Sequence, residues 1–174
     1  KLWDDVTDVE VTAVEWDEDK AEVYRDNFPN DTVEVTDAHE YLPNNFRDYD
    51  FIWASPPCPT HSDLRKKLND DPVYPDMRLY QEVLLLEHYY DGDYVVENVN
   101  PFYEPLIEPQ MRARHALWSN FHIPEFSGEA ANIRRDHAPK KHESGMYGFD
   151  ISDYGFKKQR ARKILNNCVD PELG

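Results

Sequence analysis

The sequence predicts an α/β fold in which a mainly parallel sheet is covered by crossover helices. Strand-like and helix-like segments alternate through the first half of the chain, which is the pattern of such sheets. The apolar run at residues 50–54 leads directly into a Ser-Pro-Pro turn, as expected where a buried strand leaves the sheet edge. The chain of 174 residues suffices for one domain of ordinary size with its own core.

The first elements follow this alternation closely. Val9 to Glu15 alternates in the period of a strand, and a helix is expected from Asp19 to Phe28, because Pro29 cannot continue it. Thr32 to Val35 is a second, short strand. Asp50 to Ala54 is a third strand, and its apolar run indicates that it is buried.

The second half begins with the longest predicted helix, Asp76 to Tyr90, which Gly92 is expected to end. Its apolar residues repeat on one face at Leu79, Val83, Leu86 and Tyr90. Tyr94 to Glu97 is the next strand, and Arg114 to Phe121 can form another. Gln159 to Asn167 has a helical pattern.

Three segments are expected along the chain. Residues 1–121 form the core domain. Residues 122–158 carry Gly, Pro and charge with little periodicity, which indicates a small irregular insertion. Residues 159–174 are expected to return to the core.

The charge balance is strongly acidic, with 35 Asp and Glu against 19 Lys and Arg and a formal net charge of −16. This balance argues against a nucleic-acid partner in dilute buffer, because phosphate binding relies on Lys and Arg. Proteins that work in molar salt tend to carry such an excess of surface carboxylates, because salt at about 1 M screens their repulsion beyond ~3 Å. We therefore expect that the protein comes from a halophilic organism or its virus, with an acidic mesophilic protein as the alternative.

The chain has neither an apolar run of the roughly 20 residues that span a bilayer nor a leader-like N-terminus. Its two cysteines, Cys58 and Cys168, lack metal-ligand spacing, and His61 has no suitably spaced partner. We expect a cytoplasmic protein without a metal site.

Candidate functional residues lie at the carboxyl ends of predicted strands, where open α/β sheets bind ligands. They are Glu15, Asp37, the Cys58 loop and Glu97. A thiol on a proline-stiffened loop suits a nucleophile, and a neighbouring carboxyl group suits an acid. The alternatives are an inert buried thiol at Cys58 and a turn-capping role for Glu97.

The segment Pro56-Pro57-Cys58, followed about forty residues later by Glu97-Asn98-Val99 after an amphipathic helix, resembles the catalytic pair of the DNA cytosine-5 methyltransferase family. This resemblance implies a Rossmann-like S-adenosylmethionine-dependent methyltransferase sheet with a small irregular recognition insertion. It also implies that Cys58 attacks carbon 6 of a flipped cytosine and that Glu97 assists. The expected partner is double-stranded DNA, bound by a monomer.

The resemblance extends to other segments. Glu15-Trp16 is similar to the family segment that holds the ribose and adenine of S-adenosyl-L-methionine, and Asp37 stands where the family contacts the adenine amino group. The Asn167-Cys168-Val169 segment resembles the one that packs beside the cofactor. The full predicted cofactor set is Glu15, Trp16, Asp37, Pro57, Leu79, Asn167 and Val169.

Gln110-Met111-Arg112-Ala113-Arg114 resembles the family's Gln-x-Arg-x-Arg motif, which assigns Arg112 and Arg114 to the catalytic site. A second Arg-x-Arg at Arg160 and Arg162 imitates the motif, but a strand is expected after Arg114. The predicted DNA-binding residues are Ser62, Gln110, Arg134, Arg135, Lys140 and Lys141.

The sequence departs from the family pattern in three places. The glycine loop for the methionine part of the cofactor would fall before Lys1, and we expect a truncated or incompletely represented N-terminus. Pro59 replaces the usual Gln after the nucleophile. The recognition segment is short, as in compact viral members.

Three rival functions are compatible with parts of this pattern. An RNA methyltransferase of the same fold would use the same Cys and Glu. An enzyme acting on free cytidine monophosphate also uses a Pro-Cys nucleophile, but would not need the Gln-x-Arg-x-Arg segment. A decayed, non-enzymatic DNA-binding homologue would explain the absent glycine loop.

Overall fold

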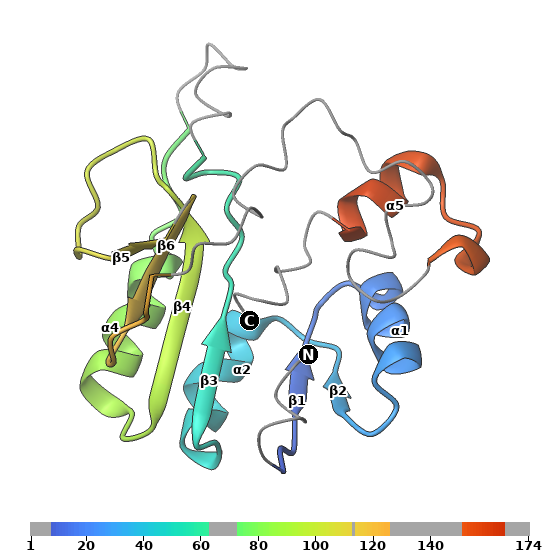
Figure 1. The fold of residues 1–174 in the computed structure, drawn as a ribbon, viewed down its shortest axis with the longest axis horizontal. Coiled ribbons are helices and arrows are strands. Elements are labelled where there is room, and N and C mark those ends of the chain that lie inside the picture. The colour runs from blue at the N-terminus through green and yellow to red at the C-terminus, as the bar shows by residue number, and fades with distance from the viewer. Residues whose placement is uncertain (1–7, 63–72, 113, 126–150, 166–174) are drawn as a thin grey trace. The chain divides into compact units, whose positions relative to one another are not determined.

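The structure is a computed structural model that describes residues 8–62, 73–112, 114–125 and 151–165 (Figure 1). The chain divides into two compact units. Unit 1 comprises residues 1–38 and 128–174, and unit 2 comprises residues 39–127.

Unit 1 contains a parallel pair of short strands, β1 (Thr12–Val14) and β2 (Thr32–Glu34). Helix α1 (Glu18–Asn27) connects them. Acidic residues occupy its first turn and Arg25 its last, which suits the helix dipole. The helix ends at Phe28, whose backbone N–H donates to the carbonyl of Tyr24.

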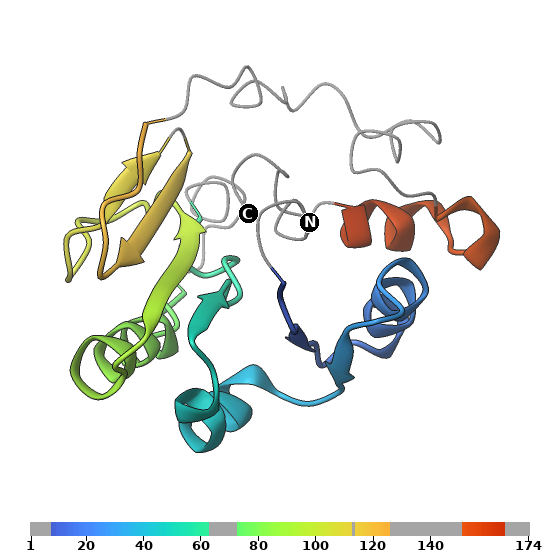
Figure 2. The same cartoon turned by 60° about the horizontal axis from the view of Figure 1, so that its bottom comes forward.

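Unit 1 also contains a short 3-10 helix, η5 (Ser152–Tyr154), and helix α5 (Lys158–Leu165), which lies beside α1 (Figure 2). The contact has a small apolar cluster of Val23 and Ile151, with Tyr154, Phe156 and Ala161 packed against it. Gly155 follows η5 with φ +64°, a left-handed conformation that favours glycine.

Unit 2 is built on a four-stranded sheet with the order β3-β4-β6-β5. Strand β3 pairs with β4 in parallel, whereas β6 pairs antiparallel with both β4 and β5. The strands are β3 (Phe51–Ala54), β4 (Asp93–Val99), β5 (Gln110–Arg112) and β6 (His115–Ser119).

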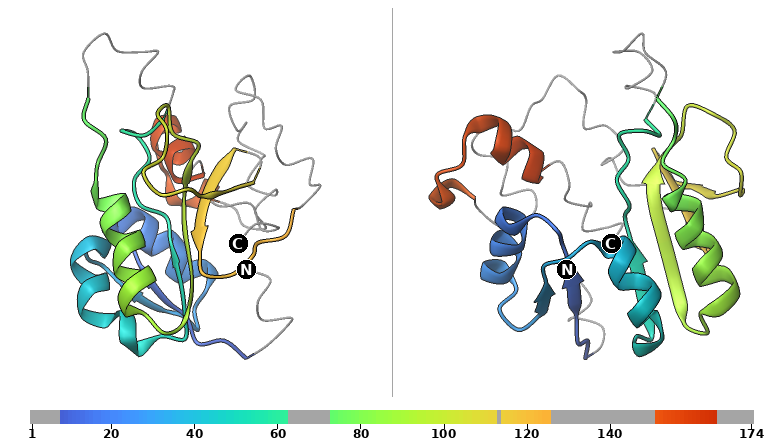
Figure 3. Two further views of the ribbon diagram at one scale, coloured as in Figure 1. Left: turned by 90° about the vertical axis from the view of Figure 1, so that its left-hand side faces the viewer. Right: turned by 180° about the vertical axis from the view of Figure 1, so that it is seen from behind.

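Helix α4 (Arg78–Tyr89) lies along β4 on one face of this sheet (Figure 3). Of the predicted stripe, Leu79, Val83 and Leu86 are buried in the helix, each at most 2% exposed, and Tyr80 is buried beside them. The fourth predicted member, Tyr90, follows the last helical residue and is partly buried against the same core. From the sheet these side chains meet Tyr94 and Val96 of β4 and two residues of β6. Because side chains alternate along a strand, Val95, Glu97 and Val99 face the other side.

Two further helical segments precede β3 in unit 2, and the sequence pattern predicts neither. They are α2 (Ala38–Asn45) and the 3-10 helix η2 (Phe46–Asp48), whose Phe46 joins the core. Pro43 lies inside α2 and hides the helix from a sequence-based prediction, since proline removes a backbone donor.

The predicted mixed α/β class is confirmed by these helices and sheets. The predicted strands and helices are present with ends shifted by a few residues, but Asp50–Ala54 is only partly buried, with Ile52 as its one buried residue. The division at residues 121 and 158 stays a prediction, because most of the insertion lies outside the described residues.

The predicted role of Gly92 as a helix end is wrong. Helix α4 ends at Tyr89, and its C-cap, Tyr90, is extended. A Cβ at Gly92 would lie 2.3 Å from the Tyr90 hydroxyl and 2.6 Å from the Asp50 carbonyl oxygen. Glycine is therefore required here by the close approach of neighbouring atoms rather than by helix termination.

No helix in the described segments has the length and apolar character needed to cross a membrane.

Candidate active site

The site in unit 2 begins with the loop that follows β3. Cys58 lies four residues beyond the end of this strand and is half-buried. Three prolines surround it, at positions 56, 57 and 59, and restrict the backbone. The carbonyl of Cys58 accepts backbone hydrogen bonds from His61 at 3.0 Å and Ser62 at 3.1 Å, which close a turn after the thiol. Cys58 therefore lies at the start of a turn within a loop whose backbone is restricted by proline.

The loop is fastened to the neighbouring strand by Asn98, which is 1% exposed. Its side-chain Nδ2 donates to the Pro56 carbonyl at 2.9 Å, and its Oδ1 accepts from the Val99 backbone N–H at 3.0 Å. Beyond the thiol, Ser62 forms an isolated antiparallel bridge with Pro101. The two attachments lie on either side of Cys58 and tie its loop to β4 and to the segment that directly follows β4.

His61 belongs to the turn that follows the thiol, and it is only 1% exposed. Its Nδ1 is 2.6 Å from the Tyr103 hydroxyl, which Tyr80 contacts in turn at 3.4 Å. Burial lowers the pKa of His61, so its neutral form is favoured at pH 7. A neutral imidazole suits this buried position, where Nδ1 contacts the Tyr103 hydroxyl and Nε2 has no hydrogen-bond partner among the described residues.

Glu97 projects from β4 on the face opposite α4, and its side chain is 12% exposed. Burial, and then the negative charge of Glu97, raise the pKa of the Cys58 thiol above its ordinary value of 9.0. The charge of this carboxylate therefore disfavours ionisation of the thiol. At neutral pH the resting cysteine is a protonated thiol, which must lose its proton before it can attack.

A histidine connects Glu97 to the next strand. His115 of β6 places its Nδ1 2.5 Å from the Glu97 Oε1. The Nε of Arg114 donates to the other ring nitrogen of His115 at 3.4 Å. Thus Glu97 and Arg114, two predicted catalytic residues, are joined through a residue that sequence reasoning does not single out.

The other two named positions of the Gln-x-Arg-x-Arg segment, Gln110 and Arg112, bind the backbone of residues 121–124. The guanidinium of Arg112 donates to the carbonyls of Ile123 and Pro124. Gln110 donates to the Phe121 carbonyl at 2.7 Å and accepts from the Ile123 backbone N–H at 2.9 Å. These contacts explain both side chains structurally, while their predicted catalytic and DNA-binding roles remain predictions.

The described part of unit 1 contains three of the predicted cofactor residues, at or beyond the ends of its strands. Trp16 directly follows Glu15 and is 71% exposed, which is unusual for so large an apolar side chain. The Glu15 carboxylate accepts from the Asp17 backbone N–H at 3.0 Å and pairs with Lys20 at 3.2 Å. Asp37 is exposed three residues after β2.

The alternative Arg-x-Arg segment begins in α5 rather than in a strand. Arg160 pairs with Asp17 and Asp19 at the start of α1. This guanidinium lowers the pKa of Asp17. By contrast, β6 follows Arg114 as expected. Arg160 therefore has a structural role in unit 1.

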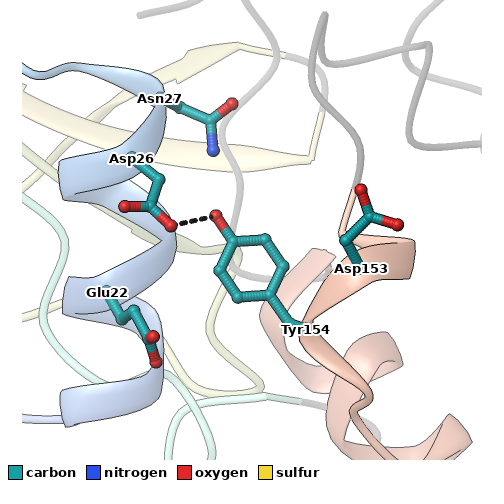
Figure 4. A pocket seen from close by; sticks show the side chains of 5 residues that line it. All are labelled: Glu22, Asp26, Asn27, Asp153 and Tyr154. Carbon is teal, nitrogen blue, oxygen red and sulfur yellow. Dashed lines mark hydrogen bonds between the residues drawn. The ribbon is translucent and has the colours of Figure 1, made fainter.

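A cleft in unit 1 lies between α1 and η5 (Figure 4). Its lining is acidic, and the Tyr154 hydroxyl points to Asp26 and donates to it at 2.8 Å. Burial and this carboxylate raise the pKa of Tyr154 to about 12. The residues that line the cleft are Glu22, Asp26, Asn27, Asp153 and Tyr154.

Of the remaining predicted residues, Pro57 is exposed next to the nucleophile, and Leu79 is 2% exposed within the core of unit 2. Packing alone accounts for the burial of Leu79, and its predicted cofactor contact stays a prediction. The predicted residues that lie outside the described part of the chain are Arg134, Arg135, Lys140, Lys141, Asn167 and Val169.

Within the described residues, no group of three or more His, Cys, Asp or Glu side chains is arranged to hold a metal ion. The site residues instead include a thiol, a carboxylate and an arginine held by a strand-anchored hydrogen-bond network. Such a set suits addition of a sulfur nucleophile to an electron-poor ring with acid assistance.

Comparison with known proteins gives one family. The sequence model of the C-5 cytosine-specific DNA methylase family matches residues 4–102, which is more than half of the chain. The matched region includes both Cys58 and Glu97. A search of curated proteins found none that matches.

Proposed function

The chain belongs to the C-5 cytosine-specific DNA methylase family, and from this premise we propose that it methylates carbon 5 of a cytosine in double-stranded DNA through a covalent adduct with Cys58. The observation that carries the proposal is the half-buried thiol on a proline-rich loop, which Asn98 fastens beside Glu97. The family supports cytosine-5 methyltransferase activity. The adduct, the methyl donor and the DNA substrate are the proposed refinements.

The thiol is needed because carbon 5 of cytosine is a poor nucleophile. In the proposed reaction the Cys58 thiol gives up its proton as its sulfur forms a bond to carbon 6, and the ring nitrogen N3 takes up a proton that Glu97 stabilises, so that one proton passes in net from sulfur to N3. The electron pair then moves to carbon 5, which becomes nucleophilic. After methylation, a base removes the carbon 5 proton, and the carbon–sulfur bond breaks to release the thiolate.

The raised pKa of Cys58 is compatible with this sequence of steps. Before cytosine binds, the carboxylate of Glu97 disfavours a second negative charge on the thiol. When Glu97 hydrogen-bonds to the protonated ring nitrogen, its charge is compensated. The thiolate therefore forms only when a cytosine is bound and can be attacked. In the absence of cytosine the cysteine stays protonated, which protects it from unwanted reactions.

S-adenosyl-L-methionine is the proposed methyl donor, and it supplies a methyl group on a positively charged sulfur that carbon 5 can attack. In unit 1, the exposed indole of Trp16 offers a surface for stacking a purine. The Glu15 carboxylate, oriented by the Asp17 N–H and Lys20, can accept hydrogen bonds from ribose hydroxyls. These residues fit the adenosine part of the donor.

A cytosine within a DNA duplex is stacked and paired, so both reacting carbons are inaccessible until the base is flipped out. Arg114 is exposed next to His115 and can contact the flipped base, and Ser62 can donate to a backbone phosphate. The formal net charge of −16 opposes DNA binding at low ionic strength. Because molar salt screens this repulsion, DNA binding is expected at high ionic strength.

The decisive experiment is transfer of a labelled methyl group from S-adenosyl-L-methionine to duplex DNA in molar KCl. The wild type and Cys168→Ala, the matched control at the second cysteine, are expected to transfer it, whereas Cys58→Ala is not. Methyl transfer by Cys58→Ala would refute the assignment of Cys58 as the nucleophile. An RNA duplex is the parallel substrate, and transfer to RNA alone would overturn the DNA assignment.

A duplex with 5-fluorocytosine tests the adduct directly, because fluorine at carbon 5 leaves no proton to remove and the carbon–sulfur bond cannot break. The wild type and Cys168→Ala should become covalently linked to this DNA on a denaturing gel, and Cys58→Ala should not. Labelled product without a trapped complex would contradict the proposed adduct.

A further inference from the structure

His115 stands between two residues of the proposed site and contacts both. Its Nδ1 is 2.5 Å from the Glu97 Oε1, and its Nε2 accepts from the Arg114 Nε at 3.4 Å. The side chains of His115 and Glu97 are 19% and 12% exposed. The contact is thus largely shielded from water, where a hydrogen bond to a charged group is strongest.

The sheet register explains why these side chains meet. In the antiparallel pair of β4 and β6, His115 lies opposite Val99 and Glu97 lies opposite Leu117. Positions two residues apart share a face, so His115 and Glu97 are diagonal neighbours on the side of the sheet opposite α4. Rigid strands on both sides therefore fix the contact, without any loop contribution.

The hydrogen bonds also determine the tautomer of His115. A guanidinium can only donate, so the Nε2 that faces Arg114 must carry a lone pair. A neutral imidazole then has its proton on Nδ1, the atom that faces the carboxylate. His115 thereby donates a hydrogen bond from Nδ1 to the Glu97 carboxylate. The positive charge of Arg114 at Nε2 polarises the imidazole and strengthens this bond.

We propose that His115 is a positioning residue, which holds the Glu97 carboxylate in the orientation needed at the cytosine ring. This inference rests on the proposed cytosine methylation. With Oε1 bound to His115, the other carboxylate oxygen is left to hydrogen-bond to ring nitrogen N3. Without His115, the carboxylate can rotate about its side-chain bonds, and the productive orientation must be selected in every turnover.

Two variants separate positioning from simple packing. His115→Leu keeps much of the volume but removes the donor, whereas His115→Asn retains an N–H near the position of Nδ1. We expect His115→Leu to lower kcat by roughly 10- to 100-fold, the range for loss of a partner that orients a functional side chain. His115→Asn should recover most of this loss. KM for DNA should remain within about threefold, because the contact acts on the transition state.

The matched control is Asn120→Ala, which removes side-chain hydrogen bonds at the other end of β4, to Tyr94 and Gly92. Its kcat should equal that of the wild type at a temperature where both are folded. A His115→Leu enzyme with full kcat would overturn the inference. So would equal losses in the Leu and Asn variants, because these would indicate a packing role.

Failure of the proposed function is recognised separately, since the wild type would then methylate neither DNA nor RNA. The inference is then decided by nuclear magnetic resonance of the labelled imidazole nitrogens, assigned with His115→Asn. The expected result is a proton on Nδ1 whose resonance moves in Glu97→Ala. A proton on Nε2, or a resonance that Glu97→Ala leaves unchanged, would overturn it.

Discussion

Replacing Asn98 by alanine should destabilise the protein and also disturb the nucleophile. The buried side chain makes the 2.9 Å hydrogen bond that ties the Pro56 carbonyl to β4, and a second hydrogen bond to the Val99 backbone N–H. Pro56 is half-buried, and an acceptor shielded from water that loses its donor costs about 1–3 kcal/mol. A central value of about 2 kcal/mol corresponds to a fall in Tm of roughly 4–8 °C for a chain of this size.

Thermal unfolding followed by circular dichroism measures the stability change, and alkylation of Cys58 by iodoacetamide, quantified by peptide mass spectrometry, measures the change at the loop. The matched control is Asn120→Ala, because the exposed side chain of Asn120, after β6, bonds to the backbone of Gly92 and Tyr94 at the opposite end of β4 from Asn98. It should cost less stability and leave the alkylation rate of Cys58 unchanged.

Two results would refute the reasoning about Asn98. An unchanged Tm would mean that the buried hydrogen bonds contribute nothing to folding. A lower Tm with unchanged alkylation of Cys58 and unchanged kcat would mean that the loop keeps its position without Asn98. The proposed coupling between β4 and the nucleophile would then be wrong.

Three further predictions concern charge and packing. Because burial and Glu97 raise the pKa of Cys58, alkylation of the wild-type thiol should accelerate as pH rises above 9.0. Glu97→Gln removes the negative charge, so it should lower that pKa and speed alkylation at pH 8. Slower alkylation of this variant than of the wild type would contradict the prediction. Gly92→Ala should lower Tm, because its Cβ would meet Tyr90 and overpacking costs roughly 1–3 kcal/mol. At Gly155 an added Cβ meets open space, so only the positive φ opposes Gly155→Ala. Calorimetry should therefore show a larger loss of Tm for Gly92→Ala than for Gly155→Ala. Raising KCl from about 0.1 to about 2 M should raise Tm, because salt screens the repulsion of a −16 chain, and a flat profile would favour the acidic mesophile instead.

The parts of the fold that depend on local patterns could be predicted from the sequence. The apolar period of α4 and the proline after the first helix gave elements of the right type and position. The role of Gly92 could not be predicted, because it depends on the Tyr90 side chain and the Asp50 carbonyl folding back against it. Helix α2 was missed because Pro43 opposes helix formation locally and tertiary contacts prevail.

The candidate site divides in the same way. Cys58 and Glu97 stand in short motifs, so their residue types and spacing identify them. His115 has no motif of its own, and its contact with Glu97 appears only when the antiparallel register of β4 and β6 is known. Asn98 is part of the Glu-Asn-Val motif, but its bond to Pro56 joins residues 42 positions apart in the chain.

Neighbouring residues of β4 serve opposite faces of the sheet, with Asn98 directed to the buried side and Glu97 to the reactive side. A single inserted or deleted codon between Gly92 and Glu97 would exchange the two. The carboxylate would enter the core and the amide would replace it at the site, so folding and chemistry would be lost together. During evolution this stretch of the gene can therefore accept substitutions but not changes in length, whereas insertions in the surface loops can be tolerated.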